Sequence, residues 1–427
     1  MTNVADAAPV PTQTQPPARP SIGRLIAQTE IDLRLFGMLV ALGLILLTFQ
    51  IASGGTFFRP VNMVTLAVQA SGIAIISTGM VLVIVSRNID LSVGSLVGLI
   101  AMTYALLMTD WLPHYLGMGD DFPFRWAIAL ALGVALGAAV GALQGFIIAY
   151  VGVPSFIVTL GGLLSIRGLV WYLSSGAAVS GLDGDFQLIG GGAQGSIGGT
   201  LTWALGIVGC IAIVLLLANG RRQRRRFGFP VRPMWAEVLL GALGCVAVLG
   251  LSAFVNANLW PKSLTGGADV ATGYPLPIML LIGVTLVMTW IATRRRFGRY
   301  VYAYGGNPDA AELAGINTRF TILKTFVVMG ILCALAAAIA SARLNGSTLD
   351  VGQSYELYVI AAAVVGGTSF AGGIGTIPGA VLGAFVMQSL SYGLSYVGVN
   401  SPGQNVVAGI VLILAVGFDS FNRRRAH

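Results

Sequence analysis

Residues 63–85 read MVTLAVQASGIAIISTGMVLVIV, without a single Asp, Glu, Lys or Arg. Wound as an α-helix at ~1.5 Å per residue, this stretch reaches about 34 Å. The hydrocarbon core of a bilayer is ~30 Å thick, so the stretch is long enough to cross it. The segment therefore predicts a membrane-spanning helix.

Apolar stretches of this kind recur along the chain, which has 427 residues of which only 9% are charged. A soluble protein carries roughly 25% charged residues. The ~10-residue alternating strands of an outer-membrane barrel do not occur in the sequence. We predict an all-α, polytopic integral membrane protein with about twelve (10–12) transmembrane helices. The apolar stretches are 35–53, 63–85, 92–108, 126–150, 155–173, 201–218, 236–256, 276–293, 323–342, 356–371, 376–398 and 403–419.

The polar remainder of the chain indicates domain limits and orientation. Residues 1–33 predict a disordered tail, residues 34–420 the transmembrane domain and residues 421–427 a basic C-terminal segment. If twelve spans alternate from a cytoplasmic N-terminus, 19 of the 24 Lys and Arg residues fall on the cytoplasmic side. Positive charge marks cytoplasmic loops, so both termini are expected in the cytoplasm. The basic residues are then topology signals, which argues against nucleic-acid binding.

The sequence lacks the residues that several kinds of chemistry require. No Asp or Glu is expected near the middle of a span, where ion-coupled carriers usually keep ionisable groups. The only lysines, Lys262 and Lys324, do not follow a Gly-x-x-x-x-Gly loop, so the chain is not expected to hydrolyse ATP. Three scattered Cys and two His form no catalytic or metal-binding set. We predict a transport subunit rather than an enzyme, with an external energy source.

One predicted cytoplasmic loop, residues 294–322, has a helical pattern of its own. Asn307 is a good helix cap, Pro308 suits the first position, and Asp309 and Glu312 complement the positive helix end. Gly315 can close the helix in the left-handed conformation. The result is a helix of about two turns with a small apolar face, which is too short to be stable alone. It is either a docking surface for an energy-supplying partner or a reversal loop lying on lipid headgroups.

Four segments, in order, carry a resemblance to a known family. They are the loop 294–322, IDLSVGS at 89–95, PSFIVTL at 154–160 with Arg167-Gly168, and GGTS at 366–369 with GGIG at 372–375. The chain resembles the permeases of sugar ABC importers of the ribose/xylose/arabinose type. It is most similar to the longer, xylose-type members, which carry an extra middle stretch like residues 220–275. It departs from the family at Arg87-Asn88, where members often have Gly-Gly.

The resemblance implies an ABC-importer permease fold and a homodimer in the bacterial inner membrane. A periplasmic sugar-binding protein would deliver a monosaccharide, D-xylose by the closest resemblance. A separate ATPase with two fused nucleotide-binding domains would use ATP and Mg, and this chain would bind no cofactor or metal itself. A branched-chain amino-acid or other small-solute ABC permease and an ion-coupled secondary carrier remain alternatives. The residues implied in ATPase coupling are Gly305, Gly306, Asn307, Pro308, Ala310, Ala311, Glu312, Gly315, Ile316 and Asn317.

The translocation path is expected near residues that break or line helices. Asp90 and Ser92 either cap a helix or face the sugar path, and Arg167 either reaches outer headgroups or acids or lines the path. Glycine-rich breaks at Asp90–Gly94 and Gly366–Gly375 form a candidate pair of broken helices. The residues predicted for the path or the breaks are Asp90, Ser92, Gly94, Ser95, Ser155, Phe156, Thr159, Arg167, Gly366, Gly367, Thr368, Ser369, Gly372, Gly373 and Gly375.

Two further sets of residues have simpler interpretations. Weakly polar side chains inside the spans are candidates for the path or for hydrogen bonds between helices. Glycines at four-residue spacing in the fourth span predict close helix packing. The polar set is Gln69, Ser71, Ser77, Gln144, Thr159 and Gln388, and the glycine set is Gly133, Gly137, Gly141 and Gly145.

Overall fold

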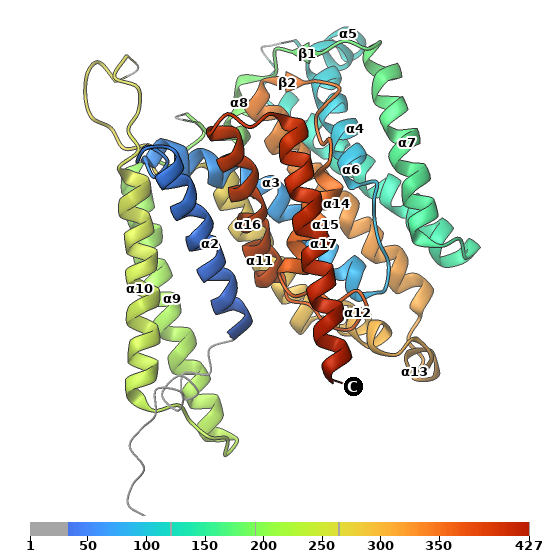
Figure 1. Cartoon of the computed structure of the whole chain (residues 1–427). Coiled ribbons are helices and arrows are strands. Elements are labelled where there is room, and N and C mark those ends of the chain that lie inside the picture. The colour runs from blue at the N-terminus through green and yellow to red at the C-terminus, as the bar shows by residue number, and fades with distance from the viewer. Residues whose placement is uncertain (1–32, 120–121, 193, 264, 427) are drawn as a thin grey trace, which may run out of the picture.

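A computed structural model describes residues 33–426 except 120–121, 193 and 264. The tail predicted for residues 1–33 therefore lies outside the described residues, apart from its last one. The described chain is almost entirely helical (Figure 1). The α-helices are α2 (Leu33–Ala52), α3 (Pro60–Val85), α4 (Val93–Leu106), α5 (Leu112–Leu116), α6 (Arg125–Phe146), α7 (Ser155–Ser174), α8 (Gly184–Gln187), α9 (Gly199–Arg226), α10 (Met234–Asn256), α11 (Leu276–Arg294), α12 (Arg296–Gly306), α13 (Pro308–Leu313), α14 (Thr318–Leu344), α15 (Tyr355–Val365), α16 (Ile377–Tyr396) and α17 (Ser401–Ala426).

Short elements complete the fold. A two-stranded antiparallel sheet pairs β1 (Val179–Ser180) with β2 (Gly346–Ser347). Wider π-type turns continue α4 and α6 at η1 (Leu107–Trp111) and η2 (Ile147–Val151), and a 3-10 turn, η3 (Leu188–Gly190), follows α8.

Ten helices in the described part of the chain are long and apolar enough to cross a membrane. Two shorter apolar helices, Tyr355–Val365 and Ser401–Leu414, correspond to the predicted tenth and twelfth stretches. The polytopic all-α prediction is confirmed. The tenth stretch differs in form, because α15 has 11 residues and reaches only about 16 Å, half of the hydrocarbon core. Residues 345–354 in front of it, which include β2, are not helical.

The core is built around α3 and α4, which are buried along nearly their whole length, and α14, of which about two thirds is buried. The glycine stripe of α6 packs against α14, as predicted. A methyl group on Gly137 or Gly141 would overlap the carbonyl oxygens of Gly330 and Phe326, respectively. Only glycine permits this backbone-to-backbone contact, which is the usual way for membrane helices to approach closely.

The predicted middle stretch 220–275 is part of a helical hairpin that stands beside α2 at the edge of the molecule (Figure 1). Its helices α9 and α10 pack mainly on each other and are largely exposed. Ion pairing reinforces the hairpin, because Arg221 Nη1 lies 2.6 Å from Glu237 Oε2. The hairpin therefore contributes little to the core.

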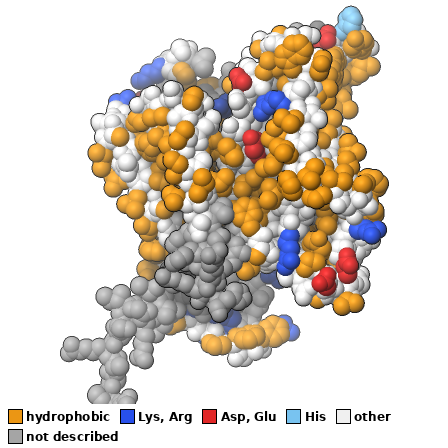
Figure 2. Space-filling view, turned by 45° about the vertical axis from the view of Figure 1, so that its right-hand side comes forward, with side chains coloured by type: hydrophobic (Ala, Val, Ile, Leu, Met, Phe, Trp, Pro, Cys, Tyr) orange, Lys and Arg blue, Asp and Glu red, His pale blue; other side chains and the backbone are white. Residues whose placement is uncertain are grey.

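The two ends of the helices differ in composition. One end, which we call the basic end, carries α12, α13, the turn after α9 and the C-terminal end of α17, whereas β1, β2 and α5 lie at the opposite end (Figure 1). Figure 2 shows hydrophobic side chains over most of one face, with few charged groups between its ends. This distribution fits a protein whose waist faces hydrocarbon.

Candidate functional site

The starts of α4 and α15 cross each other inside the protein, at what we call the helix-start crossing. A methyl group on Gly94 would overlap the carbonyl oxygen of Gly352, and one on Gly98 would lie 2.7 Å from the Val351 oxygen. Gly352 has φ +76°, a conformation that favours glycine. The non-helical segment 86–92 leads into α4, and α4 meets the backbone of the second non-helical segment, 345–354, just before that segment leads into α15.

Arg167 holds one side of the helix-start crossing. Its Nη1 donates to the carbonyl oxygens of Leu349 and Val351 at 2.9 and 3.2 Å. These carbonyls belong to the non-helical segment before α15 and have no helical partner. The structure thus shows a contact of Arg167 that neither predicted role described, and the predicted roles at outer headgroups or acids and as a path lining stay predictions. The Arg167 guanidinium supplies hydrogen bonds to carbonyl groups of this non-helical segment.

Asp90 orders the turn that precedes α4. One carboxylate oxygen, Oδ1, accepts from the backbone nitrogen of Ser92 at 2.9 Å and from its hydroxyl at 2.7 Å. The Ser92 hydroxyl in turn accepts from Gln144 Nε2 on α6 at 2.9 Å. Asp90 is only 1% exposed. Asp90 thus stabilises the turn before α4, whereas Ser92, at the N-cap position of α4, makes no side-chain capping bond; the role at the sugar path stays a prediction.

Helix α7 fastens the same turn from the other side. The Ser155 hydroxyl accepts from the Ile89 nitrogen at 3.2 Å, and Thr159 Oγ1 donates to the Ser155 carbonyl at 2.8 Å. Ser95 donates from α4 to the Leu163 carbonyl of α7 at 2.9 Å. Phe156, by contrast, is 53% exposed on the outer surface of α7. The predicted hydroxyl residues therefore hold the break together.

Two carboxylates lie inside the protein at helix starts, at the edges of the predicted apolar stretches. Glu356 stands in the first turn of α15 with its carboxylate beside Gly94. Asp90 is buried at the start of α4. Both residues flank apolar runs in the sequence. Because these helices begin inside the protein rather than at its surface, their flanking residues also lie inside.

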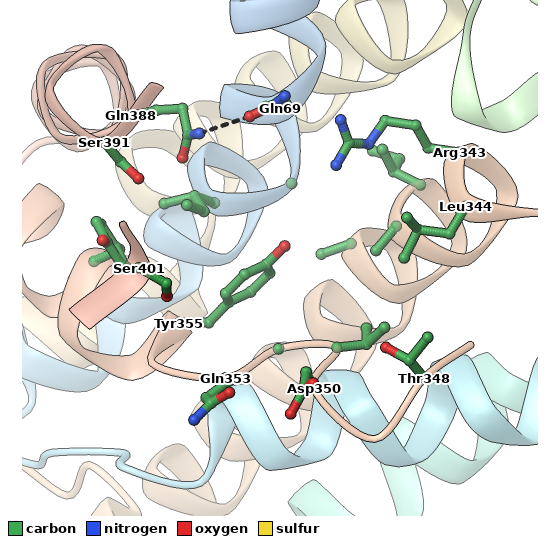
Figure 3. A pocket seen from close by; sticks show the side chains of 18 of the residues that line it. Gln69, Arg343, Leu344, Thr348, Asp350, Gln353, Tyr355, Gln388, Ser391 and Ser401 are labelled. Atoms are coloured by element: carbon green, nitrogen blue, oxygen red, sulfur yellow. Dashed lines mark hydrogen bonds between the residues drawn. The ribbon is translucent and has the colours of Figure 1, made fainter. Parts of the chain in front are cut away.

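A cavity of about 340 Å³ opens beside the helix-start crossing (Figure 3). At ~30 Å³ per water molecule, it has room for about ten waters or a small polar solute. Its lining combines apolar surfaces of α3 and α14 with polar side chains from several elements. The polar lining consists of Gln69, Arg343, Thr348, Asp350, Gln353, Tyr355, Gln388, Ser391, Ser401, Gln404 and Asn405.

Two of the predicted polar residues meet in this cavity. Gln388 Nε2 on α16 donates to Gln69 Oε1 on α3 at 3.1 Å, as the dashed line in Figure 3 shows. The other members of that set bond elsewhere: Ser71 and Ser77 donate to carbonyls of α3 one turn back. Gln144 and Thr159 serve the Asp90 turn. Only Gln69 and Gln388 of the six thus line the cavity.

Sequence reasoning missed most of the cavity. Arg343 and Asp350 lie between the predicted stretches 323–342 and 356–371, outside both, yet they line the cavity with Gln353 and Tyr355. One signal was available, namely that the tenth apolar stretch is too short to span the membrane as a helix. Non-helical chain must then complete that crossing, and its polar residues enter the interior.

The glycine-rich segment Gly366–Gly375 lies at the basic end and not at the helix-start crossing. The Gly373 nitrogen donates to the Val85 carbonyl at the end of α3 at 3.0 Å. Gly94 contacts Gly352 rather than this segment, and the correspondence between the Asp90–Gly94 and Gly366–Gly375 breaks stays a prediction. A methyl group on Gly366 would collide with Gly379, so α15 and α16 touch through their backbones.

The remaining residues of this segment shape a compact loop. Gly367, Gly372 and Gly373 have φ between +75° and +92°. The Ser369 hydroxyl accepts from the Ala371 nitrogen at 3.3 Å, and Thr368 is buried with no hydrogen-bond partner for Oγ1 among the described residues. The loop is tied to α12 by Tyr302, whose hydroxyl donates to the Gly375 carbonyl at 2.8 Å. Burial raises the pKa of Tyr302, so this donor keeps its proton at physiological pH.

Arg87 links the end of α3 to α12. Its Nε donates to the Gly305 carbonyl at 2.8 Å and its Nη2 to the Gly306 carbonyl at 3.0 Å. Residue 87 has φ +60°, a left-handed conformation that favours glycine. In this chain the strained arginine instead satisfies the last carbonyls of α12. Gly305 also packs tightly there, because a methyl group on it would overlap the Val85 oxygen.

Helix α13 forms as the sequence predicts. Asn307 Oδ1 accepts from the Ala310 nitrogen at 3.0 Å, Pro308 occupies the first position, and Gly315 has φ +78°. A similar cap follows, where Asn317 Oδ1 accepts from the Phe320 nitrogen at 2.9 Å. The loop's conformation is thus set by two asparagine caps.

The surface of α13 is divided between a buried and an exposed side. Ala311 packs inward at 4% exposure, whereas Leu313 is 90% exposed and Ala310 is exposed beside it. Glu312 Oε1 accepts from the Thr318 hydroxyl at 2.8 Å, and Ile316 is half-buried. Leu313 therefore presents an apolar side chain on the exposed side of a helix whose start is capped by Asn307.

Comparisons with known proteins agree with this architecture. Residues 62–416 match the protein family described as branched-chain amino acid transport system / permease component. The chain is 36% identical to the xylose transport system permease protein XylH of Haemophilus influenzae, over 93% of this chain and 98% of that protein. It is also 36% identical to XylH of Escherichia coli, over 96% and 97% of the two chains.

More distant relatives carry other sugars in their names. The galactose/methyl galactoside import permease protein MglC of Escherichia coli is 29% identical over 90% of this chain and 93% of that protein. No solved structure matches the chain.

Proposed function

The chain belongs to the family described as branched-chain amino acid transport system / permease component. On this premise we propose that it is the membrane-spanning subunit of an ATP-driven sugar importer with D-xylose as its substrate. The observation that carries the proposal is the 36% identity to two xylose permeases over 93–96% of the chain. Identity to a galactose-type permease is lower, at 29%.

The cavity beside the helix-start crossing is the proposed sugar path. It offers amide, hydroxyl, carboxylate and guanidinium groups that can bond to sugar hydroxyls, together with the ring of Tyr355. A permease that releases its substrate on every cycle needs weak binding, and mixed polar and apolar walls fit that need. Opening of the Gln69–Gln388 hydrogen bond would widen the path between α3 and α16.

We place the basic end in the cytoplasm, with both termini on that side. The support is the bias of Lys and Arg, because the turn after α9, the start of α12 and the end of α17 all lie there (Figure 1). In this orientation α13 faces the cytoplasm. The β1–β2 end then faces the periplasm, where a sugar-binding protein would deliver the substrate.

Helix α13 is the proposed coupling helix for an ATPase. Since the chain has no ATP-binding loop, nucleotide chemistry belongs to a partner. A groove on that partner would bury Leu313, and the rigid caps at Asn307 and Asn317 would transmit its movement to the flanking helices. We further propose a homodimer of this permease, served by an ATPase with two fused nucleotide-binding domains that uses ATP and Mg.

The contacts trace a mechanical connection from α13 to the cavity. Movement of α13 shifts the end of α12, whose carbonyls are held by Arg87. Arg87 is the second residue of the segment 86–92, and this segment ends in the Asp90 turn before α4. The start of α4 contacts Gly352, a lining residue of the cavity. Closure of the ATPase would in this way alter the cavity at the helix-start crossing.

Uptake measurements test the substrate. The chain would be expressed in cells that lack their own xylose permease but retain a matching binding protein and ATPase. We expect accumulation of labelled D-xylose that depends on ATP and competes poorly with galactose. Accumulation of leucine instead would favour the amino-acid alternative, and uptake that persists without the ATPase would favour a secondary carrier.

A further inference from the structure

A second cavity, of about 700 Å³, lies at the basic end between α11, α12 and α14. Its lining divides into two kinds of residue. The basic residues are Arg294, Arg295, Arg296, Arg299 and Lys324. The others, Trp290, Ile291, Phe297, Val327 and Val328, form an apolar wall.

The positive charge of this cavity is not neutralised within the described part of the chain, where none of its five basic residues forms an ion pair with a carboxylate. Their contacts are of other kinds. Arg295 lies over the Trp290 ring at 3.8 Å, Lys324 Nζ lies 4.1 Å from the Phe320 ring centre, and Arg299 donates to a backbone carbonyl. The cavity therefore attracts an anion.

The apolar wall shows which kind of anion fits. Trp290 and Ile291 lie about one turn before Arg294 on α11, and Val327 and Val328 lie about one turn beyond Lys324 on α14. Except for Phe297 of α12, the wall thus belongs to the spanning helices α11 and α14, which are surrounded by hydrocarbon. An occupant that matches both regions is anionic at one end and has an alkyl chain at the other.

We propose that this cavity binds an anionic phospholipid, with its headgroup phosphate among the basic side chains and an acyl chain along the apolar wall. Basic pockets between transmembrane helices on the cytoplasmic side are suited to such headgroups. An acidic cytoplasmic protein would satisfy the charges but would not reach Val327 and Val328. The observations therefore favour a lipid.

The site bears on the proposed coupling helix because it lies at the elbow between α11 and α12. Gly298 packs directly on the carbonyl oxygens of Ile291 and Ala292, so the start of α12 is pressed against the end of α11. A lipid held by residues of both helices stabilises this elbow. Since α12 leads through Asn307 into α13, the lipid also stabilises the position of α13.

Native mass spectrometry of the full-length, delipidated protein tests the site, with phosphatidylglycerol and phosphatidylcholine as the two probes. We expect tighter binding of phosphatidylglycerol. The double substitution Arg294→Gln/Arg296→Gln should weaken phosphatidylglycerol binding about 25-fold, about fivefold per arginine. Binding of phosphatidylcholine should remain unchanged. The lysine pair Arg294→Lys/Arg296→Lys keeps the charges and should retain most of the preference.

A matched control removes the same charge from the same end of the molecule. Arg222→Gln/Arg225→Gln alters two exposed arginines at the end of α9, outside the cavity. Retained binding in this control supports a defined site. If phosphatidylglycerol binding weakens equally in both double variants, the proposal is overturned in favour of diffuse attraction to the positive charge of the basic end. Absence of any preference for phosphatidylglycerol also overturns it. Unchanged lipid binding combined with lost ATPase association in Arg294→Gln/Arg296→Gln would assign the cavity to a protein partner instead.

Discussion

The helix-start crossing and the α9–α10 hairpin achieve helix contact in different ways. At the crossing, Gly94 of α4 and Gly352, just before α15, touch through their backbones. In the hairpin, a methyl group on Gly241 or Gly244 would meet only flexible side-chain ends at 3.3 Å. A backbone contact has one solution, whereas side chains can repack. The comparison separates a precisely determined centre from a tolerant, lipid-facing addition.

The largest effect is expected from filling the crossing. Gly94→Val would force valine methyl groups into the Gly352 carbonyl and should destabilise the protein by about 3 kcal/mol, the upper range for overpacking. Uptake of xylose should be lost. The matched control is Gly250→Val in the hairpin, where nothing lies within 4 Å. Thermal unfolding in detergent measures both variants, and an equal loss of stability would contradict the distinction between the two regions.

The next effect concerns the partner proposed for α13. Burial of one leucine side chain contributes ~1.5–3 kcal/mol, so Leu313→Glu should reduce uptake and ATPase association at least tenfold. Membrane insertion should be normal, because Leu313 is 90% exposed and contributes little to folding. Leu116→Glu is the control, since Leu116 is 62% exposed near the opposite end. Similar losses in both variants, or normal uptake in Leu313→Glu, would argue against docking at α13.

Arg87 provides a way to separate strain from coupling. Arg87→Gly removes the strain of a non-glycine residue in the left-handed conformation, which costs ~1–2 kcal/mol. It also removes two hydrogen bonds of similar total value, so the free energy of unfolding should change by less than about 1 kcal/mol. Uptake should fall several-fold, because α12 loses its connection to the segment before α4. Arg87→Lys keeps the strain and cannot bond in the same forked way, so it should lose both stability and uptake. Wild-type uptake in Arg87→Gly would remove Arg87 from the mechanism.

The sequence predicted those parts of the molecule that depend on local patterns. The apolar runs located the helices, the Asn307 and Gly315 signals located α13, and the stripe through Gly137 predicted close helix packing without identifying α14 as the partner. The cavity depends on contacts between distant segments, such as Gly94 with Gly352, and local patterns do not record them. Asp350 therefore resembled an ordinary loop acid in the sequence, and only the short length of α15 indicated that non-helical chain enters the interior.

The smallest effect tests whether the hairpin is independent of transport. Arg221 and Glu237 form an ion pair with side chains 20% and 13% exposed. A double-mutant cycle of Arg221→Gln and Glu237→Gln should give a coupling energy of about 1 kcal/mol, since partly buried pairs exceed exposed ones only modestly. Xylose uptake should remain within about twofold of wild type. A large loss of uptake without loss of stability would show that the hairpin moves with the helix-start crossing, and the two regions would then have to be regarded as one mechanical unit.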